Sequence, residues 1–130
     1  MQTKILIVDD DSIILGVIAE YLENCGYWVH TAHSVEAAVD KIDSEKYHIV
    51  ISDVNLPCGD EDCANNGLSL LKYVKCNQPH IEVILMSGEA DTDHQTVAGR
   101  IGVYEYLGKP FPLGILKEKI ELIERDLAPW

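Results

Sequence analysis

The sequence predicts an α/β protein in which one doubly wound, five-stranded parallel sheet carries five helices on its two faces. Two observations support this fold class. Five short apolar runs alternate along the chain with five segments whose apolar residues recur at helical spacing, and the connections between them are short. Such alternation is typical of a parallel sheet covered on both faces, because each strand is reached by a right-handed crossover.

The strands are predicted from short apolar runs that end in polar or turn-forming residues. The first run, KILIV, is continuous and apolar, which is typical of a strand buried on both faces. Later runs such as HIVIS have the same character, whereas the second run alternates only weakly. The predicted strands comprise residues 4–8, 27–31, 48–52, 81–86 and 103–107.

Two helices are predicted in the first third of the chain from apolar residues at helical spacing. The first stripe runs from Ile14 to Cys25, which is therefore expected to be a core thiol, and Gly26 is a natural stop. The polar residues 9–12 offer N-caps for this helix. Ser34 is expected to cap the second helix, whose apolar stripe follows it directly.

Three further helices are predicted in the rest of the chain. Apolar residues mark the third helix over residues 68–74. A weakly amphipathic helix over about residues 92–101 is expected to be broken by Gly99. Pro112 suits the first turn of the last helix, whose stripe covers residues 113–127.

Composition restricts the class of protein. The 130 residues suit one domain, residues 1–130, and a chain of this size buries roughly two-thirds of its unfolded surface. Apolar residues make up 47% and charged residues 25%, which excludes disordered and fibrous classes. Twenty-two acidic and ten basic residues leave a net charge of −12, which opposes direct binding to nucleic acid or to an anionic membrane surface.

Targeting signals and cysteines point to a reducing compartment. No apolar run approaches the ~20 residues needed to cross a bilayer, and the apolar part of MQTKILIVDDD is too short for a signal peptide. A cytoplasmic protein with reduced thiols is expected. Cys58 and Cys63 bracket the acidic segment CGDEDC, which is either a metal or redox pair or, as we favour, a solvated loop with two incidental thiols.

Chemistry is expected where the strands end, because sites in open parallel sheets form beyond the carboxyl ends of the strands. The polar residues at these ends are Asp9, Asp10, Asp53, Ser87 and Lys109. In the predicted fold they converge on one cleft. The alternatives are that the first two aspartates only cap a helix, that Ser87 is a turn residue and that Lys109 is a solvated surface lysine.

A metal site is predicted from the three aspartates. At ~4 Å and an effective dielectric constant of ~20, each pair of carboxylates repels by ~4 kcal/mol, a cost that a hard divalent cation removes. Mg²⁺ takes oxygen ligands and keeps water that a phosphate can replace. Zinc is disfavoured, because no histidine or cysteine falls at these strand ends.

Four short motifs occur in a fixed order along the chain. They are IVDDD at 7–11, SDVNLP at 52–57, MSG at 86–88 and YLGKPF at 106–111. Together they resemble the CheY-like receiver domain of two-component response regulators, and the resemblance covers essentially the whole chain. It implies the flavodoxin-like strand order 2-1-3-4-5. It also implies a phosphoprotein of signal transduction that catalyses only its own phosphorylation and dephosphorylation.

The resemblance assigns roles around the expected metal. Asp53 corresponds to the phosphoacceptor. Asp10 corresponds to a direct Mg²⁺ ligand and Asp9 to a residue that acts through water, while Asn55 supplies a backbone carbonyl to the metal. The resemblance also implies that Mn²⁺ can take the place of Mg²⁺. Asn55 and Glu89 occupy positions that tune the lifetime of the phosphorylated state.

The resemblance also assigns the conformational switch. Ser87 matches the hydroxyl position of the family and Lys109 its lysine, and both would contact the phosphoryl group. Tyr106 matches an aromatic residue that turns from exposed to buried when Ser87 moves toward the phosphate. The Lys109–Pro110 peptide bond is expected to be cis.

The partners implied by the resemblance are proteins. A sensor histidine kinase or a phosphotransfer protein would supply the phosphoryl group. A downstream protein or effector domain would read the face made by the fourth helix, fifth strand and fifth helix, and a phosphorylation-dependent homodimer is a further implied state. No direct contact with nucleic acid or membrane is expected. A complete single-domain regulator and the receiver of a longer protein both fit the sequence.

The sequence disfavours two rival classes of protein and departs from the family in one segment. A Mg²⁺-dependent phosphatase that forms an aspartyl phosphate favours D-x-D, whereas Asn55 occupies the second position after Asp53, and a cap domain has no room. Neither Gly-rich phosphate-binding motif of nucleotide-binding proteins occurs. Residues 58–66 form a longer segment than is usual in the family; it is either a tolerated insertion or an element that affects docking, hydrolysis or cation binding.

Overall fold

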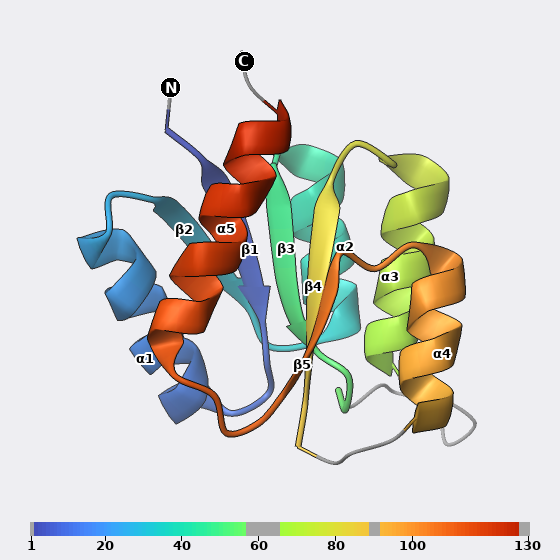
Figure 1. The fold of residues 1–130 in the computed structure, drawn as a ribbon. Coiled ribbons are helices and arrows are strands. Elements are labelled where there is room, and N and C mark those ends of the chain that lie inside the picture. The colour runs from blue at the N-terminus through green and yellow to red at the C-terminus, as the bar shows by residue number, and fades with distance from the viewer. Residues whose placement is uncertain (1, 57–65, 89–91, 128–130) are drawn as a thin grey trace.

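The computed structural model describes residues 2–56, 66–88 and 92–127. Within them, five strands alternate with five helices along the chain (Figure 1). The strands are β1 (Lys4–Val8), β2 (Trp28–Ala32), β3 (Ile49–Asp53), β4 (Glu82–Ser87) and β5 (Glu105–Gly108). The helices are α1 (Ser12–Asn24), α2 (Val35–Ser44), α3 (Asn66–Asn77), α4 (Thr92–Ile101) and α5 (Leu113–Leu127).

All neighbouring strands are parallel, and the sheet has the order β2-β1-β3-β4-β5. This confirms the predicted fold class and strand order. The register pairs Val8 with Ser52, and it pairs Asp53 with Met86 one strand further along. Because the strands are parallel, the residues that follow them meet at one edge of the sheet.

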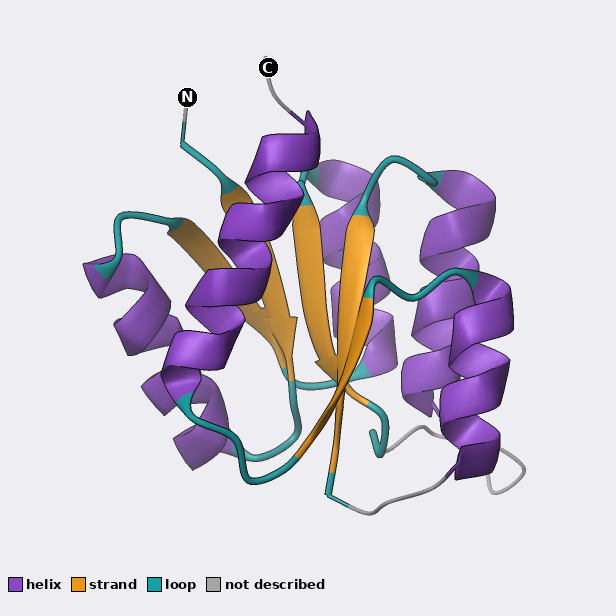
Figure 2. Ribbon diagram, viewed as in Figure 1, coloured by secondary structure: helices purple, strands orange, loops and turns teal. Residues whose placement is uncertain are grey.

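The helices form two layers around the sheet (Figure 2). Each layer encloses its own apolar core. Helices α1 and α5 cover one face, where fully or nearly fully buried residues include Ile5, Ile7, Leu22, Leu116 and Ile120. Helices α2, α3 and α4 cover the other face, with Leu6, Val8, Ile42, Leu70 and Leu71 among the buried residues. The sheet is therefore buried on both sides, which explains the continuous apolar runs of its central strands.

Two local predictions were wrong. Helix α4 continues through Gly99, because Ala98 is fully buried in the core and glycine costs a helix only ~1 kcal/mol. Cys25 is only half-buried, since it is the C-cap of α1 and follows the last complete turn, just before Gly26 with its φ of 96°. The bounds of β1 agree with the prediction, and those of the other four strands differ from it by one or two residues.

Some predictions fall outside the described residues. These concern Cys58, Cys63, Glu89 and most of the 58–66 segment. In the described ranges, no helix combines the length and the apolarity needed to cross a bilayer.

Candidate functional site

The β1–α1 junction supplies two of the predicted carboxylates. Asp9 is 1% exposed, and its Oδ1 accepts a hydrogen bond of 2.9 Å from the Asp11 N–H. Asp11 is the N-cap of α1, since its Oδ1 accepts from the N–H groups of Ile13 and Ile14. Asp10 is exposed. Because Asp11 performs the capping, neither Asp9 nor Asp10 is required for it.

The end of β3 places Asp53 in the centre of the sheet edge. The residue is 8% exposed, and its Oδ1 accepts a hydrogen bond of 3.0 Å from the Asn55 N–H. The backbone then leaves the strand while remaining fixed to β4, because the Val54 N–H donates to the Met86 carbonyl at 2.8 Å. Asp53 is thus held at the junction of a central strand and a tight turn.

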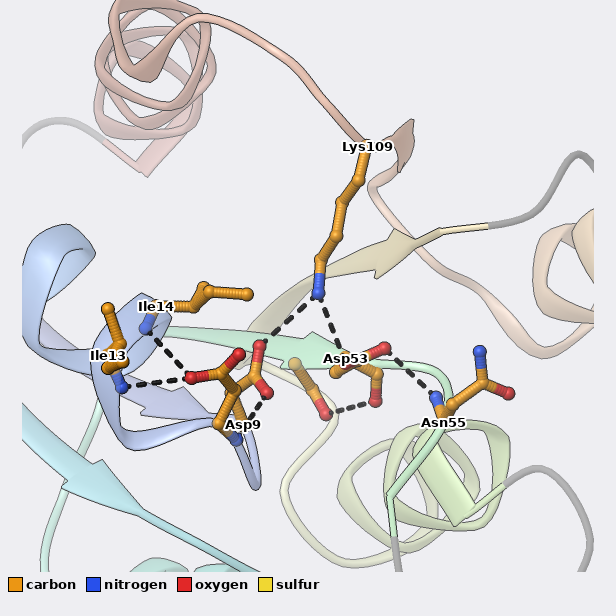
Figure 3. Close-up of polar contacts among 8 residues, drawn as sticks. Asp9, Ile13, Ile14, Asp53, Asn55 and Lys109 are labelled. Atoms are coloured by element: carbon orange, nitrogen blue, oxygen red, sulfur yellow. Dashed lines mark hydrogen bonds and ion pairs between the residues drawn. The ribbon is translucent and has the colours of Figure 1, made fainter.

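Lys109 connects the two buried aspartates. Its Nζ lies 3.1 Å from Asp53 Oδ2 and 3.3 Å from Asp9 Oδ2, and Figure 3 shows the side chain reaching between them. The Lys109 N–H donates to the Ser87 carbonyl at 2.7 Å, and the bond to Pro110 is cis. Burial by itself would lower the pKa of Lys109, but hydrogen bonds and charges from Asp53 and Asp9 outweigh it and raise the pKa. The ammonium is therefore charged at neutral pH.

The three predicted carboxylates come together. One oxygen each from Asp9, Asp10 and Asp53 lies within 4.8 Å of the others. Ionised, they carry three negative charges against the single positive charge of Lys109, so the cluster retains an excess of two. An all-oxygen set with this excess fits a hard divalent cation, and the described residues offer no nitrogen or sulfur ligand beside it.

Ser87 and Tyr106 lie on the β4–β5 side of the cleft. Ser87 is 3% exposed at the end of β4, where it pairs in register with Gly108. Tyr106 is half-buried and packs against the apolar core on the face of the sheet that α2, α3 and α4 cover. Its hydroxyl is buried without a hydrogen-bond partner in the described part of the chain. In this structure the ring is therefore already directed inward, whereas the resemblance implies an exposed starting position.

An apolar groove, which was not predicted from the sequence, borders the cleft on the α1 side. It reaches Lys109 and is lined by Ile14, Ile18, Phe111 and Leu113, among others. At its rim Ile13 is 78% and Val17 50% exposed. The one sequence signal was Ile13, an isoleucine that lies off the buried stripe of its helix.

This fold and this cluster define a class of protein. The chain matches the family model of the response regulator receiver domain over residues 5–121. It belongs to this family, and hence to the receiver domains of two-component systems.

Individual relatives differ in how much of them the chain covers. The chemotaxis protein CheY of Pseudomonas aeruginosa is 33% identical over 124 residues, which are 92% of this chain and 94% of that protein. The DNA-binding transcriptional regulator NtrC of Klebsiella pneumoniae is 32% identical over 95% of this chain, but the chain spans only about a quarter of its length. The crystal structure of a CheY-like receiver domain protein from Methanospirillum hungatei JF-1 has a TM-score of 0.87 at 30% identity and covers 96% of both chains.

Proposed function

We propose that this chain, residues 1–130, is one receiver domain that accepts a phosphoryl group on Asp53 from a sensor histidine kinase or a phosphotransfer protein. The proposal rests mainly on the groups that surround the Asp53 carboxylate. One ammonium lies 3.1 Å away, and two further carboxylates complete a cluster of excess negative charge. Such a carboxylate is a nucleophile placed beside groups that can neutralise a phosphate.

Each side chain has a role in this transfer. An Asp53 oxygen forms a bond to phosphorus while the phosphorus–nitrogen bond of the donor histidine breaks, and the histidine nitrogen leaves with the bonding electrons. Lys109 neutralises one phosphoryl oxygen, and the Ser87 hydroxyl donates to another. Charge neutralisation and positioning supply most of the catalysis of such transfers.

The acidic cluster is proposed to hold Mg²⁺, for which Mn²⁺ can substitute. Asp9, Asp10, Asp53 and the Asn55 backbone carbonyl would hold the ion, which would offset the charge of the incoming phosphoryl oxygens. Both carboxylate oxygens of Asp9 already have a partner, Oδ1 in the Asp11 N–H and Oδ2 in Lys109 Nζ, which supports a role through water for Asp9. Asp10 is exposed, which supports direct ligation for this residue.

The proposed signal is a change of surface. The phosphoryl group adds charge and acceptor oxygens to Asp53, and Ser87 moves toward it. Tyr106 follows, and the face formed by α4, β5 and α5 changes for a downstream protein, an effector domain or a second copy of the chain. Asn55 and Glu89 are proposed to tune the lifetime of this state.

The proposed setting follows from charge and from the partners. A net charge of −12 disfavours direct contact with nucleic acid or membrane, and the proposed kinase and effector act in the cytoplasm. The exposed Ile13 and Val17 beside Lys109 give a protein donor an apolar surface next to Asp53. The chain itself catalyses only its own phosphorylation and dephosphorylation.

The test uses acetyl phosphate as a small phosphodonor. With Mg²⁺ we expect the intact mass of the protein to increase by one phosphoryl group, with no increase when Mg²⁺ is chelated. Asp53→Ala should gain nothing, whereas Asp40→Ala, at an exposed position on α2, should behave as wild type. Rapid turnover of phosphomonoesters without a stable adduct would instead support a phosphatase-like enzyme.

A further inference from the structure

The first turn of α3 lies in direct contact with the backbone of Asp53 and Val54, which carries the site. Gly67 is buried, and a Cβ atom added to it would lie 2.5 Å from Val54 Cα and closer still to the Asp53 carbonyl oxygen. Both contacts are with backbone atoms, so no flexible side chain can move aside. Glycine is required at this position for space, since its φ is not in the left-handed region.

Gly67 differs in this respect from the other glycines of the described helices. A Cβ at Gly16 of α1 or at Gly99 of α4 would meet nothing within 4 Å, and one at Gly114 of α5 would only touch the Tyr21 hydroxyl at 4.0 Å. The close approach is therefore a feature of the α3–β3 junction and not of helix packing in general.

The close approach fixes the segment that carries the reactive and ligating groups. The Gly67 N–H donates to the Val54 carbonyl at 3.0 Å, and the Val54 N–H donates to the Met86 carbonyl at 2.8 Å. The Asn55 N–H, one residue further, donates to Asp53 Oδ1. These hydrogen bonds fix residues 53–55 to α3, to β4 and to their own turn.

We propose that Gly67 is a positioning residue for the phosphoacceptor site. Its missing side chain lets α3 hold the Asp53–Asn55 backbone, and with it the Asp53 carboxylate and the Asn55 carbonyl, in the geometry that transfer requires. The proposal rests on the proposed function of Asp53. Restoring ordinary contact, which begins at 3.4 Å, requires a backbone displacement of about 1 Å, and a displacement of this size can lower a rate about 100-fold.

The test compares Gly67→Ala with Gly99→Ala, a matched helical glycine that has space for a Cβ. The rate of phosphoryl uptake from acetyl phosphate is measured by mass against Mg²⁺ concentration, under conditions in which urea titration shows both variants folded. In Gly67→Ala we expect a maximal rate about 10- to 100-fold lower and a higher half-saturating Mg²⁺ concentration. Gly99→Ala should match wild type in both quantities.

A merely structural role for Gly67 would change the urea midpoint but leave the uptake rate of the folded variant and its Mg²⁺ dependence at wild-type values, and this result would overturn the proposal. Where Gly67→Ala does not fold, amide hydrogen exchange of the wild-type protein decides. We expect Mg²⁺ to slow exchange of the Gly67 N–H relative to that of Gly99; equal effects would overturn the proposal. Failure of wild type to take up a phosphoryl group would refute the proposed function itself.

Discussion

The two ends of the sheet both bury polar side chains, but they satisfy them in opposite ways. At the amino end, the Glu124 carboxylate of α5 accepts hydrogen bonds from Thr3 Oγ1 at 2.6 Å and from the Tyr27 hydroxyl at 3.2 Å. At the carboxyl end, the carboxylates of Asp9 and Asp53 share the single ammonium of Lys109. At the amino end, one carboxylate is thus paired with two neutral donors, whereas at the carboxyl end two carboxylates are paired with one cation.

Other contacts extend this contrast. At the amino end, Lys75 Nζ donates to the Ile81 carbonyl at 2.7 Å, and His48 Nδ1 accepts from the Lys4 N–H at 3.0 Å. Each of these polar groups is therefore paired with another group in the described part of the protein. At the carboxyl end, the three clustered carboxylates outnumber the one ammonium that contacts them in the described residues, and a bound cation would offset this excess. We therefore expect the polar contacts of the amino end to act mainly on stability and those of the carboxyl end on ligand chemistry.

The largest expected effect comes from removing Lys109, whose ammonium contacts both buried aspartates of the carboxyl end. Lys109→Met leaves Asp9 and Asp53 facing each other without neutralisation. We expect phosphoryl uptake from acetyl phosphate to fall about 100-fold or more, as when a donor to a developing charge is removed. The free energy of unfolding in chelator should fall by about 1–3 kcal/mol.

The matched control is Lys119→Met, which breaks a surface pair with Glu105 whose N–O distance is 3.7 Å. Its uptake rate should equal that of wild type, and its stability should change by less than about 1 kcal/mol. Added Mg²⁺ should stabilise wild type and recover part of the stability that Lys109→Met loses. Uptake by Lys109→Met at the wild-type rate would contradict the role of the ammonium.

The amino end should show the reverse effect. Glu124→Ala leaves the hydroxyls of Thr3 and Tyr27 without this acceptor, and we expect a loss of about 1–3 kcal/mol in the free energy of unfolding. Phosphoryl uptake at a temperature where the variant is folded should stay at the wild-type rate. Glu121→Ala, at an exposed position on the same helix, is the control and should change neither quantity. A slower uptake in Glu124→Ala would refute the division between the two ends.

Adjacent aspartates allow the same comparison within the β1–α1 junction. Asp10→Asn removes a carboxylate of the cluster and should weaken Mg²⁺ binding at least about tenfold, with little change of stability in chelator. Asp11→Ala removes the N-cap and should cost about 1 kcal/mol of stability while Mg²⁺ affinity is unchanged. Calorimetric titration with Mg²⁺ and urea unfolding measure the two quantities. An Mg²⁺ affinity of Asp10→Asn equal to that of wild type would contradict the role of Asp10 as a ligand.

Much of the carboxyl end of the sheet was predictable, because its residues are identified by short local segments of the sequence. Parallel strands bring their carboxyl ends to one edge, so residues 9, 53 and 109 could be placed together from the ends of apolar runs. The structure confirms that Asp9, Asp10 and Asp53 cluster and that Lys109 contacts two of them. Their proposed roles in transfer remain predictions.

The remaining features depend on contacts between distant parts of the chain. Thr3 and Glu124 lie 121 residues apart, and no pattern near either one indicates the other. Gly67 has an unexceptional sequence context, and its importance appears only when α3 is packed against β3. Gly99 failed as a predicted helix breaker for the same reason, since the burial of Ala98 outweighs local propensity.

The smallest expected effect concerns pH at the amino end. Burial lowers the pKa of His48, the charges of Lys4 and His80 lower it further, and that of Glu124 opposes them. The neutral ring also accepts the Lys4 N–H, which a protonated Nδ1 cannot do. Since the unfolded chain, with a histidine pKa of about 6.5, takes the proton more readily, stability should be complete above that value and should fall as pH decreases toward the folded pKa.

His48→Gln removes this titration, so its free energy of unfolding should fall less than that of wild type between pH 7.5 and 5.5. Glu124→Ala should have the opposite effect, because loss of the nearby negative charge lowers the pKa of His48 further and steepens the decline. Urea titrations at both pH values measure these slopes. Identical slopes in wild type and His48→Gln would mean that the His48–Lys4 contact does not depend on the charge of the ring. If the free energy of unfolding of Glu124→Ala fell less than that of wild type over the same pH range, the sign assigned to the Glu124 effect would be wrong.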